Sequence, residues 1–275
     1  MRLENKVAIV TGAGSGIGEG IACTYAKEGC KVALAGRTRS TLEKTAEKIT
    51  EMGGESLVVV TDVAESEQVA HMVLQTKERF GRIDILVNNA ASSPPMGVGI
   101  ADLAEKDWDN VMNVDLRGAF LCCRYVIPVM IGQGKGKIIN ISSVAGVVAE
   151  KGVNVYGVAK AGIIQLTRQV AVDHARQGIN ANCICPGYID TPMTAPLLMD
   201  DRLRESIVSF FPIRRIGKPE EVAHGAVYLG SDEADYVTGA VLAIDGGFLC
   251  GTQEMFMGWQ MGIQEVIKKY GEFQM

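Results

Sequence analysis

The chain has 275 residues, of which 47% are hydrophobic and 21% are charged, and its net charge is −5. This composition is that of a globular protein, and the length allows one α/β domain with a sizeable core. The negative charge argues against nucleic acid or an anionic membrane surface as a partner. Neither a signal peptide nor an apolar stretch of about twenty residues is evident, so we expect a cytoplasmic protein.

Short apolar runs typical of strands alternate with stretches of helical periodicity. The expected strands are Val7–Val10, Lys31–Ala35, Ser56–Val60, Ile83–Asn88, Lys137–Ile141, Asn180–Ile184 and Val241–Ile244. The expected helices are Ile17–Glu28, Thr41–Met52, Ser66–Phe80, Glu105–Ile131, Val155–Arg176 and Pro219–Ser231. This alternation predicts a single α/β domain of the Rossmann type, a doubly wound parallel sheet of about seven strands with helices on both faces.

Two segments, residues 193–212 and 248–275, interrupt the alternation, and each follows a strand. In a doubly wound sheet, ligands bind beyond the carboxyl ends of the strands. We therefore expect a dinucleotide-binding domain of residues 1–248 that includes a substrate loop, 193–212. The remaining residues, 249–275, form an extension that would pack on the pocket or on a neighbouring subunit.

A glycine-rich turn, TGAGSGIG at residues 11–18, separates the first expected strand from the first expected helix. Such a turn lets the backbone approach a pyrophosphate, and the helix N-terminus supplies free N–H groups and a positive dipole end. Glycine turns have many other uses. Its place between a strand and a helix favours a dinucleotide-binding unit.

Tyr156 and Lys160 form a Tyr-x-x-x-Lys pair in the segment NVYGVAKAG. Residues four apart share one face of a helix, so the ammonium can lie beside the phenol. A nearby cation lowers the pKa of a tyrosine from about 10 toward the range in which it exchanges protons with an alcohol or ketone. Alone, the pair would be better explained as part of an ordinary helix; with the glycine turn upstream it indicates catalysis.

Together these motifs resemble the short-chain dehydrogenase/reductase family over roughly residues 3–248. The matching segments, in the family's order, are TGAGSGIG at 11–18, Asp62-Val63, NNA at 88–90, ISS at 141–143, the Tyr156–Lys160 pair, PGYIDTPM at 186–193, RRIGKPEEVA at 214–223 and YVTGAVLAIDGG at 236–247. The resemblance implies a nicotinamide-dependent oxidoreductase that assembles as a homotetramer or homodimer.

The resemblance also assigns catalytic roles. Tyr156 would be the general acid in ketone reduction and the base in alcohol oxidation, while Lys160 lowers its pKa and binds the nicotinamide ribose. Ser143, thirteen residues before Tyr156, would hydrogen-bond the substrate oxygen. Strand alternation puts Ser142 on the opposite face, and only the spacing favours Ser143.

One catalytic position departs from the family pattern. Where the family usually has an Asn that supports a proton-relay water, alignment of VMNVDLRGAF places Asp115, and Asn113 faces elsewhere on the helix. An ionised Asp accepts hydrogen bonds but donates none, so we expect some bonds of the helix kink to be lost or reversed and activity to survive. Ala91, where the family has Gly, adds a methyl group near the cofactor.

The end of the second expected strand, KVALAGRTRS, bears on the choice of cofactor. Enzymes that use NAD typically have an acidic residue there, whereas this chain has Gly36 followed by Arg37. A guanidinium can bind a 2′-phosphate, so NADP (NADPH) is favoured over NAD, although an exposed loop arginine would look the same. The resemblance implies further cofactor contacts at Gly12, Ser15, Gly16, Ile17, Gly18, Asp62, Val63, Asn89, Ile189 and Thr191.

The two interrupting segments are rich in apolar residues: Met193, Leu197, Leu198, Met199, Phe210 and Phe211 in the first, and Met255, Phe256, Met257, Trp259 and Met261 in the second. Met-rich surfaces adapt to irregular apolar ligands, which suggests a hydrophobic small-molecule substrate. Docking of the second segment on a neighbouring subunit is an equal alternative. The seven cysteines are odd in number and lack metal-ligand spacing, so we expect reduced, buried thiols and no metal site.

Three functions remain open. The first is an NADP(H)-dependent dehydrogenase of a hydrophobic secondary alcohol, of the hydroxysteroid (bile-acid-like) type. The second is a 3-oxoacyl-(acyl-carrier-protein) reductase, for which Arg214, Arg215 and Lys218 could form a basic docking patch. The third, a non-catalytic cofactor-binding sensor or scaffold, ranks last because Tyr156 and Lys160 are both kept.

Overall fold

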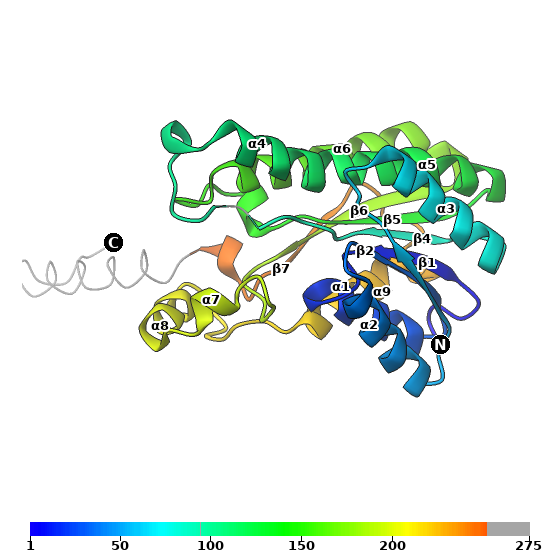
Figure 1. Ribbon diagram of the computed structural model, residues 1–275, viewed down its shortest axis with the longest axis horizontal. Coiled ribbons are helices and arrows are strands. Elements are labelled where there is room, and N and C mark those ends of the chain that lie inside the picture. Colours follow the sequence, from blue (N-terminus) through cyan, green and yellow to red (C-terminus); the bar gives the residue numbers. More distant parts are fainter. Residues whose placement is uncertain (94, 252–275) are drawn as a thin grey trace, which may run out of the picture.

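A seven-stranded parallel sheet forms the centre of the computed structural model, which describes residues 1–93 and 95–251 (Figure 1). Within the described residues the strand order is β3-β2-β1-β4-β5-β6-β7. The strands are β1 (Val7–Thr11), β2 (Lys31–Gly36), β3 (Ser56–Val60), β4 (Ile85–Asn88), β5 (Gly136–Ile141), β6 (Ile179–Pro186) and β7 (Val241–Ile244). The predicted doubly wound α/β fold is confirmed, and each expected strand overlaps one of these.

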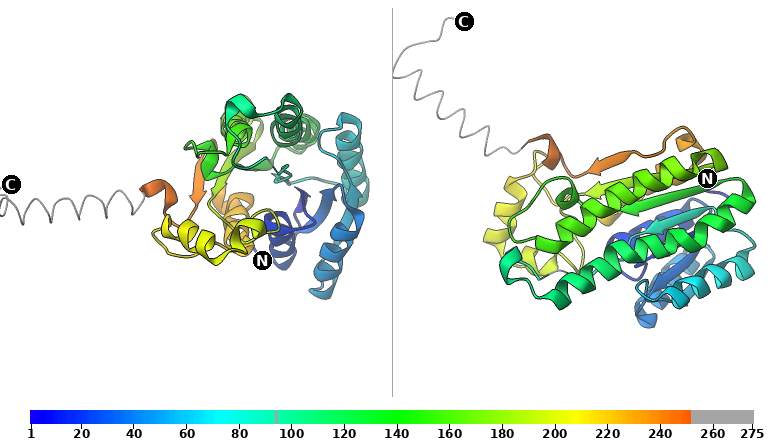
Figure 2. Two further views of the ribbon diagram at one scale, coloured as in Figure 1. Left: turned by 60° about the vertical axis from the view of Figure 1, so that its left-hand side comes forward. Right: turned by 90° about the horizontal axis from the view of Figure 1, so that it is seen from above.

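Helices cover both faces of the sheet (Figures 1 and 2). One face carries α1 (Gly16–Lys27), α2 (Arg39–Glu51) and α9 (Pro219–Gly230). The other carries α3 (Ser66–Phe80), α4 (Glu105–Val111), α5 (Gly118–Gln133) and α6 (Asn154–His174). Short 3-10 turns lie at Ile100–Asp102, Val144–Gly146, Ala175–Gln177, Asp232–Ala234 and Phe248–Cys250.

The hydrophobic core lies in two layers, one on each side of the sheet. Successive residues of a strand point to opposite faces, so Val10 packs in the layer under α1 and α9 while Ile9 packs in the layer under α3 and α5. Both side chains are completely buried. A strand buried on both faces needs a continuous apolar run, which is why these strands stand out in the sequence.

The long helix expected at 105–131 is not continuous. Between α4 and α5, residues Met112–Arg117 form a π-helical segment, so the prediction of one regular helix is wrong there. The wider turn buries Asp115, which is 1% exposed. Gly118 directly follows the π-helical segment, and a Cβ at position 118 would lie 2.7 Å from the side chain of Val63. Such π-helical turns are rare and occur frequently at functional sites.

The sheet reverses its strand order at β1, whose neighbours are β2 and β4. The crevice at such a switch point is the usual ligand site of a doubly wound fold. Two short helices, α7 (Ala195–Leu198) and α8 (Asp201–Ser209), occupy the expected substrate loop after β6. Most of the expected extension, residues 252–275, lies outside the described residues. None of the helices that the structure describes is long and apolar enough to cross a membrane.

Candidate active site

The glycine turn after β1 packs closely against the strand and helix that flank it. Gly12 and Gly16 have φ angles of 65° and 55°, which favour glycine, and a Cβ at Gly18 would lie 2.2 Å from the carbonyl oxygen of Gly12. The side-chain amide of Asn89, just beyond β4, donates to the carbonyl oxygens of Thr11 and Gly12, at 2.9 and 3.3 Å. The turn is therefore a backbone cradle held in place by these contacts, of the kind that can approach a pyrophosphate at a helix N-terminus.

An elongated groove runs along the carboxyl ends of the strands. Its central cavity, about 240 Å³, extends from the glycine turn to Tyr156. A neighbouring cavity of about 160 Å³ continues past Gly12 and Ser15 to Arg37. The groove brings together nearly all the predicted cofactor contacts: Gly12, Ser15, Gly16, Ile17, Asn89, Ile189 and Thr191 line the central cavity, and Arg37, Asp62 and Val63 line the other. Gly18 lines neither cavity.

Arg37 stands at the far end of this groove with its side chain exposed. It makes no hydrogen bond or ion pair with any described residue, whereas Arg39 is 3.6 Å from the carboxylate of Glu43 on the same helix. No acidic side chain occupies position 36, where Gly36 ends β2. The guanidinium of Arg37 is therefore available to an anionic group bound in the groove.

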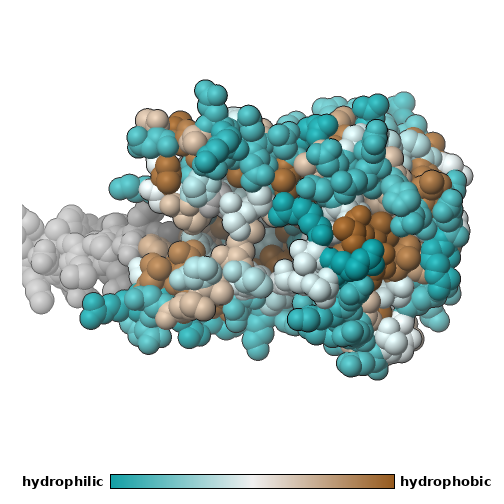
Figure 3. Space-filling model, viewed as in Figure 1, coloured by the Kyte–Doolittle hydropathy of each residue, from teal (hydrophilic) through white to brown (hydrophobic). Residues whose placement is uncertain are grey.

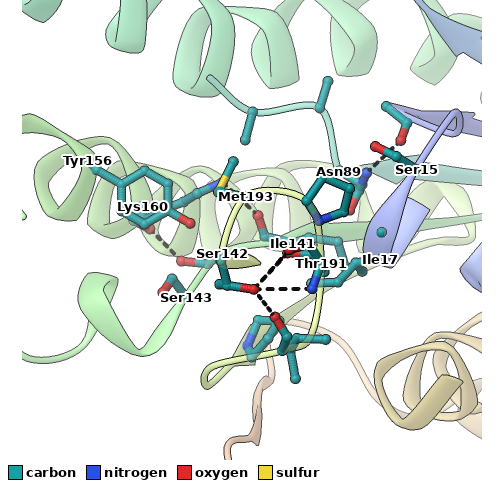
Figure 4. A pocket seen from close by; sticks show the side chains of 18 of the residues that line it. Ser15, Ile17, Asn89, Ile141, Ser142, Ser143, Tyr156, Lys160, Thr191 and Met193 are labelled. Atoms are coloured by element: carbon teal, nitrogen blue, oxygen red, sulfur yellow. Dashed lines mark hydrogen bonds between the residues drawn. The ribbon is translucent and has the colours of Figure 1, made fainter. Parts of the chain in front are cut away.

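Tyr156, Lys160, Ser142 and Ser143 meet at the other end of the groove, below the first turns of α6 (Figure 4). Ser142 is buried and its hydroxyl donates to the carbonyl oxygen of Lys160 at 2.7 Å, so it ties β5 to α6. The hydroxyl of Ser143 accepts from the N–H of Ala145 at 3.2 Å. Both serines line the cavity, but the hydroxyl of Ser142 is engaged within the fold, whereas that of Ser143 lies beside Tyr156.

Lys160 is buried, and its ammonium has three neighbours. The Nζ atom is 5.2 Å from the ring centre of Tyr156, donates to the carbonyl oxygen of Ile141 at 3.2 Å, and lies 3.2 Å from Oδ2 of Asp115. Burial lowers the pKa of Lys160, but Tyr156 and Asp115 together raise it above its ordinary value. The contact with Asp115 therefore favours the charged form of the lysine.

The pKa of Tyr156 moves in the direction opposite to the one expected from the sequence. Burial raises it above its ordinary value, and the negative charge of Asp115 adds to that effect. Lys160 and Ser143 lower it, but by less than the total increase. The prediction considered the cation alone, and the cost of ionising a phenol inside the protein outweighs it.

Three further residues near the site were missed in the sequence. Ser92 donates to Asp115 through both its N–H and its hydroxyl. Tyr188, just after β6, donates to the carboxylate of Glu150 at 3.3 Å, and Glu150 raises the pKa of Tyr156. In the sequence, Glu150 lies between Ser143 and Tyr156, and that position was the only signal that could have placed it near the site.

The cysteines and acidic residues of the described chain form no metal site: no group of three or more potential ligands comes together there. All seven cysteines are free. Five of them are buried, but Cys250 is exposed and Cys23 is only partly buried, so the expectation of uniformly buried thiols is wrong for these two.

Comparison with known proteins gives consistent matches. A family model described as enoyl-(acyl carrier protein) reductase matches residues 12–249. The 3-oxoacyl-(acyl-carrier-protein) reductase FabG of Thermotoga maritima is 39% identical over 249 residues, which are 90% of this chain and 100% of that protein. The 2-(R)-hydroxypropyl-CoM dehydrogenase of Xanthobacter autotrophicus is 41% identical over 89% of this chain and 98% of its own.

A solved structure, that of NAD+-bound xylitol dehydrogenase, superimposes with a TM-score of 0.86 at 32% identity. The match covers 90% of this chain and all of that one. The similarity therefore extends over the sheet, its helices and the groove.

Proposed function

The chain belongs to the short-chain dehydrogenase/reductase family, whose members are oxidoreductases acting on CH–OH groups, and we propose that it is NADP(H)-dependent and acts on a hydrophobic secondary alcohol or ketone. Within that class, we propose a hydroxysteroid of the bile-acid type as the substrate. One observation carries the proposal: Tyr156, Lys160 and Ser143 meet at one end of a groove whose other end holds the exposed Arg37.

Each side chain in this arrangement has a chemical task. The hydroxyl of Ser143 can donate a hydrogen bond to the substrate oxygen, and the phenol of Tyr156 gives that oxygen a proton during reduction or takes one during oxidation. Lys160 stabilises the phenolate and can bind a ribose hydroxyl. A bound nicotinamide dinucleotide supplies or accepts the hydride at the substrate carbon.

The fit of the cofactor rests on the cradle after β1. A side chain at Gly18 would collide with the carbonyl of Gly12, and a Cβ at Gly16 would lie 3.0 Å from Thr191. The glycines thus let the turn pack closely against helix α1 and the loop after β6, and its backbone can approach a pyrophosphate. Arg37 is exposed and unpaired among the described residues, and it supports NADP over NAD because a guanidinium can bind a 2′-phosphate. Gly36 at the end of β2 adds no carboxylate that would repel that phosphate.

Replacing Arg37 by Ala should raise KM for NADPH by at least about tenfold and change KM for NADH little, since hydrogen bonds between charged groups contribute roughly 1.5–3 kcal/mol. Steady-state kinetics with both cofactors measures the change. Arg39→Ala is the matched control, because Arg39 is already engaged by Glu43. A wild-type enzyme with higher kcat/KM for NADH than for NADPH would contradict the cofactor assignment.

The substrate proposal draws on Met193, which lines the central cavity, and on exposed apolar residues of the loop that follows it. Met193, Met199 and Leu203, in and beside α7 and α8, are 42%, 83% and 41% exposed. Apolar side chains show at the surface there, beside the central hollow (Figure 3). Exposed apolar side chains beside a cavity are typical of a site for an apolar ligand. Glu150 and Tyr188 add polar groups close to Tyr156, which suit a substrate carrying a second hydroxyl.

Oxidation of NADPH in the presence of steroid, acyl-thioester and sugar ketones tests this proposal. The expected result is the highest kcat/KM with a hydroxylated steroid ketone. A preference for acyl thioesters would instead favour a 3-oxoacyl-(acyl-carrier-protein) reductase. Turnover of none of them, with tight cofactor binding, would favour a sensor or scaffold.

The reductase alternative is supported by the similarity to the Thermotoga maritima protein. It needs a basic surface for the acidic carrier protein, and Arg215 contributes little to one because its guanidinium is paired with Glu221 at 2.5 and 2.7 Å.

We also propose that the protein works as a homotetramer or homodimer, which its mass in solution tests.

A further inference from the structure

A buried charge pair sets this active site apart from the family pattern. Asp115 lies in the π-helical segment between α4 and α5, and Lys160 lies in α6. Their side chains are 0% and 2% exposed, and Oδ2 of Asp115 is 3.2 Å from Nζ of Lys160. At the corresponding position the family usually has an uncharged Asn.

The surroundings fix the carboxylate in this orientation. Its Oδ1 atom accepts from the N–H of Ser92 at 2.8 Å and from the Ser92 hydroxyl at 3.1 Å. Its Oδ2 atom accepts no hydrogen bond from the described residues and forms the ion pair with the ammonium. The carboxylate lies in the π-helical segment, where Val114 and Asp115 are the buried residues.

The ammonium of Lys160 therefore acts on two groups at once. On one side lies the carboxylate, and on the other lies the ring of Tyr156, 5.2 Å from Nζ. A full positive charge beside a phenol would favour the phenolate, but a charge balanced by a carboxylate does so less. In a buried site this balance is weakly screened by solvent.

We propose that Asp115 is a positioning residue: it holds Lys160 in place, and its negative charge shifts the working range of Tyr156 to higher pH. An Asn at position 115 can keep the contacts with Ser92 through its one oxygen, and it then presents an uncharged NH2 group to Lys160 in place of the carboxylate oxygen. The kinetic part of the test rests on the proposed oxidoreductase function, whereas the titration of Tyr156 does not.

Other charges act on the same groups and belong in the balance. Burial raises the pKa of Glu150, which hydrogen-bonds with Tyr188, and burial raises the pKa of Tyr188 to about 12. These groups stay in place when Asp115 is changed, so their effect on Tyr156 is constant. The titratable groups that interact with Tyr156 or Lys160 include Asp115, Glu150, Cys183, Cys185 and Tyr188, besides the two residues themselves.

The test is Asp115→Asn, read first in the cofactor-free protein. Tyrosine labelled with 13C at Cζ gives an NMR signal for each of the seven tyrosines, and Tyr156→Phe identifies the signal of Tyr156. The expected result is ionisation of Tyr156 at lower pH in the Asn variant than in the wild type. An unchanged or higher midpoint would overturn the proposal, whatever happens to turnover.

Kinetics supply the second readout. Alcohol oxidation needs the phenolate, so its rate rises with pH through the ionisation of Tyr156. At a pH on that rising limb, Asp115→Asn should reach a fraction of its own maximal kcat/KM that is at least about threefold larger than the fraction reached by the wild type. A threefold difference corresponds to a displacement of the pH profile by about half a pH unit. An NMR shift without any turnover would leave this inference standing and count against the proposed function.

Ser92→Ala is the matched control, because it removes a hydrogen bond to Asp115 and keeps the charge. Its Tyr156 midpoint should equal that of the wild type. A shift as large as that of Asp115→Asn would show that packing, not charge, controls the tyrosine and would overturn the proposal. If the Asn variant does not fold, Asp115→Ser removes the same charge and must lower the midpoint.

Discussion

Tyr156→Phe is expected to lower kcat by about 10²–10⁴-fold, the range typical of a lost general acid or base. The substitution removes one hydroxyl and little volume from a residue that lines the cavity. Binding of NADPH should stay nearly unchanged, because Lys160, Arg37 and the glycine cradle remain. Single-turnover kinetics and a fluorescence titration of NADPH measure the two effects separately.

The control for this substitution is Tyr236→Phe, which makes the same chemical change at a fully exposed tyrosine that lines neither cavity of the groove. Its kcat should match that of the wild type. Near wild-type kcat in Tyr156→Phe would remove Tyr156 from the acid–base role. Loss of NADPH binding in that variant would show instead that the hydroxyl supports the cofactor site.

Much of the fold could be predicted because its signals are local. Strands buried on both faces need continuous apolar runs, and a glycine turn between a strand and a helix has a characteristic spacing. Tyr156 and Lys160 are brought together by one turn of helix, so their proximity needed no knowledge of the tertiary structure. The carboxyl ends of parallel strands then place Ser143 and the glycine turn at the same edge.

The remaining features depend on tertiary structure. The π-helical segment has the same apolar periodicity as the helices around it, so nothing in the pattern separates Met112–Arg117 from a regular helix. The contact between Asp115 and Lys160 joins two elements that meet only in the folded chain. The pKa of Tyr156 follows from how deeply the phenol is buried, which neither its neighbours in the sequence nor its spacing reveals.

Lys160→Met should lower the free energy of unfolding by about 3–5 kcal/mol, the usual cost of removing one partner from a buried ion pair. It leaves the carboxylate of Asp115 in the interior without a countercharge. Cofactor binding and catalysis should weaken as well, because the same cation serves both. Urea denaturation of the cofactor-free protein at neutral pH measures the stability without reference to activity.

The decisive variant is the double change Lys160→Met with Asp115→Asn, which removes both charges. It should be more stable than Lys160→Met alone by about 2 kcal/mol or more, since no unpaired buried charge remains.

Lys137 provides the comparison, because its side chain is just as deeply buried, at 3% exposure, while its partner Asp235 is 51% exposed. Removing Lys137 leaves a carboxylate that water can solvate and that Lys135 still contacts at 3.0 Å. Lys137→Met should therefore not be rescued by adding Asp235→Asn. If the second substitution restored the free energy of unfolding equally in both pairs, or in neither pair, Asp115 and Lys160 would contribute no more than an ordinary partly exposed ion pair.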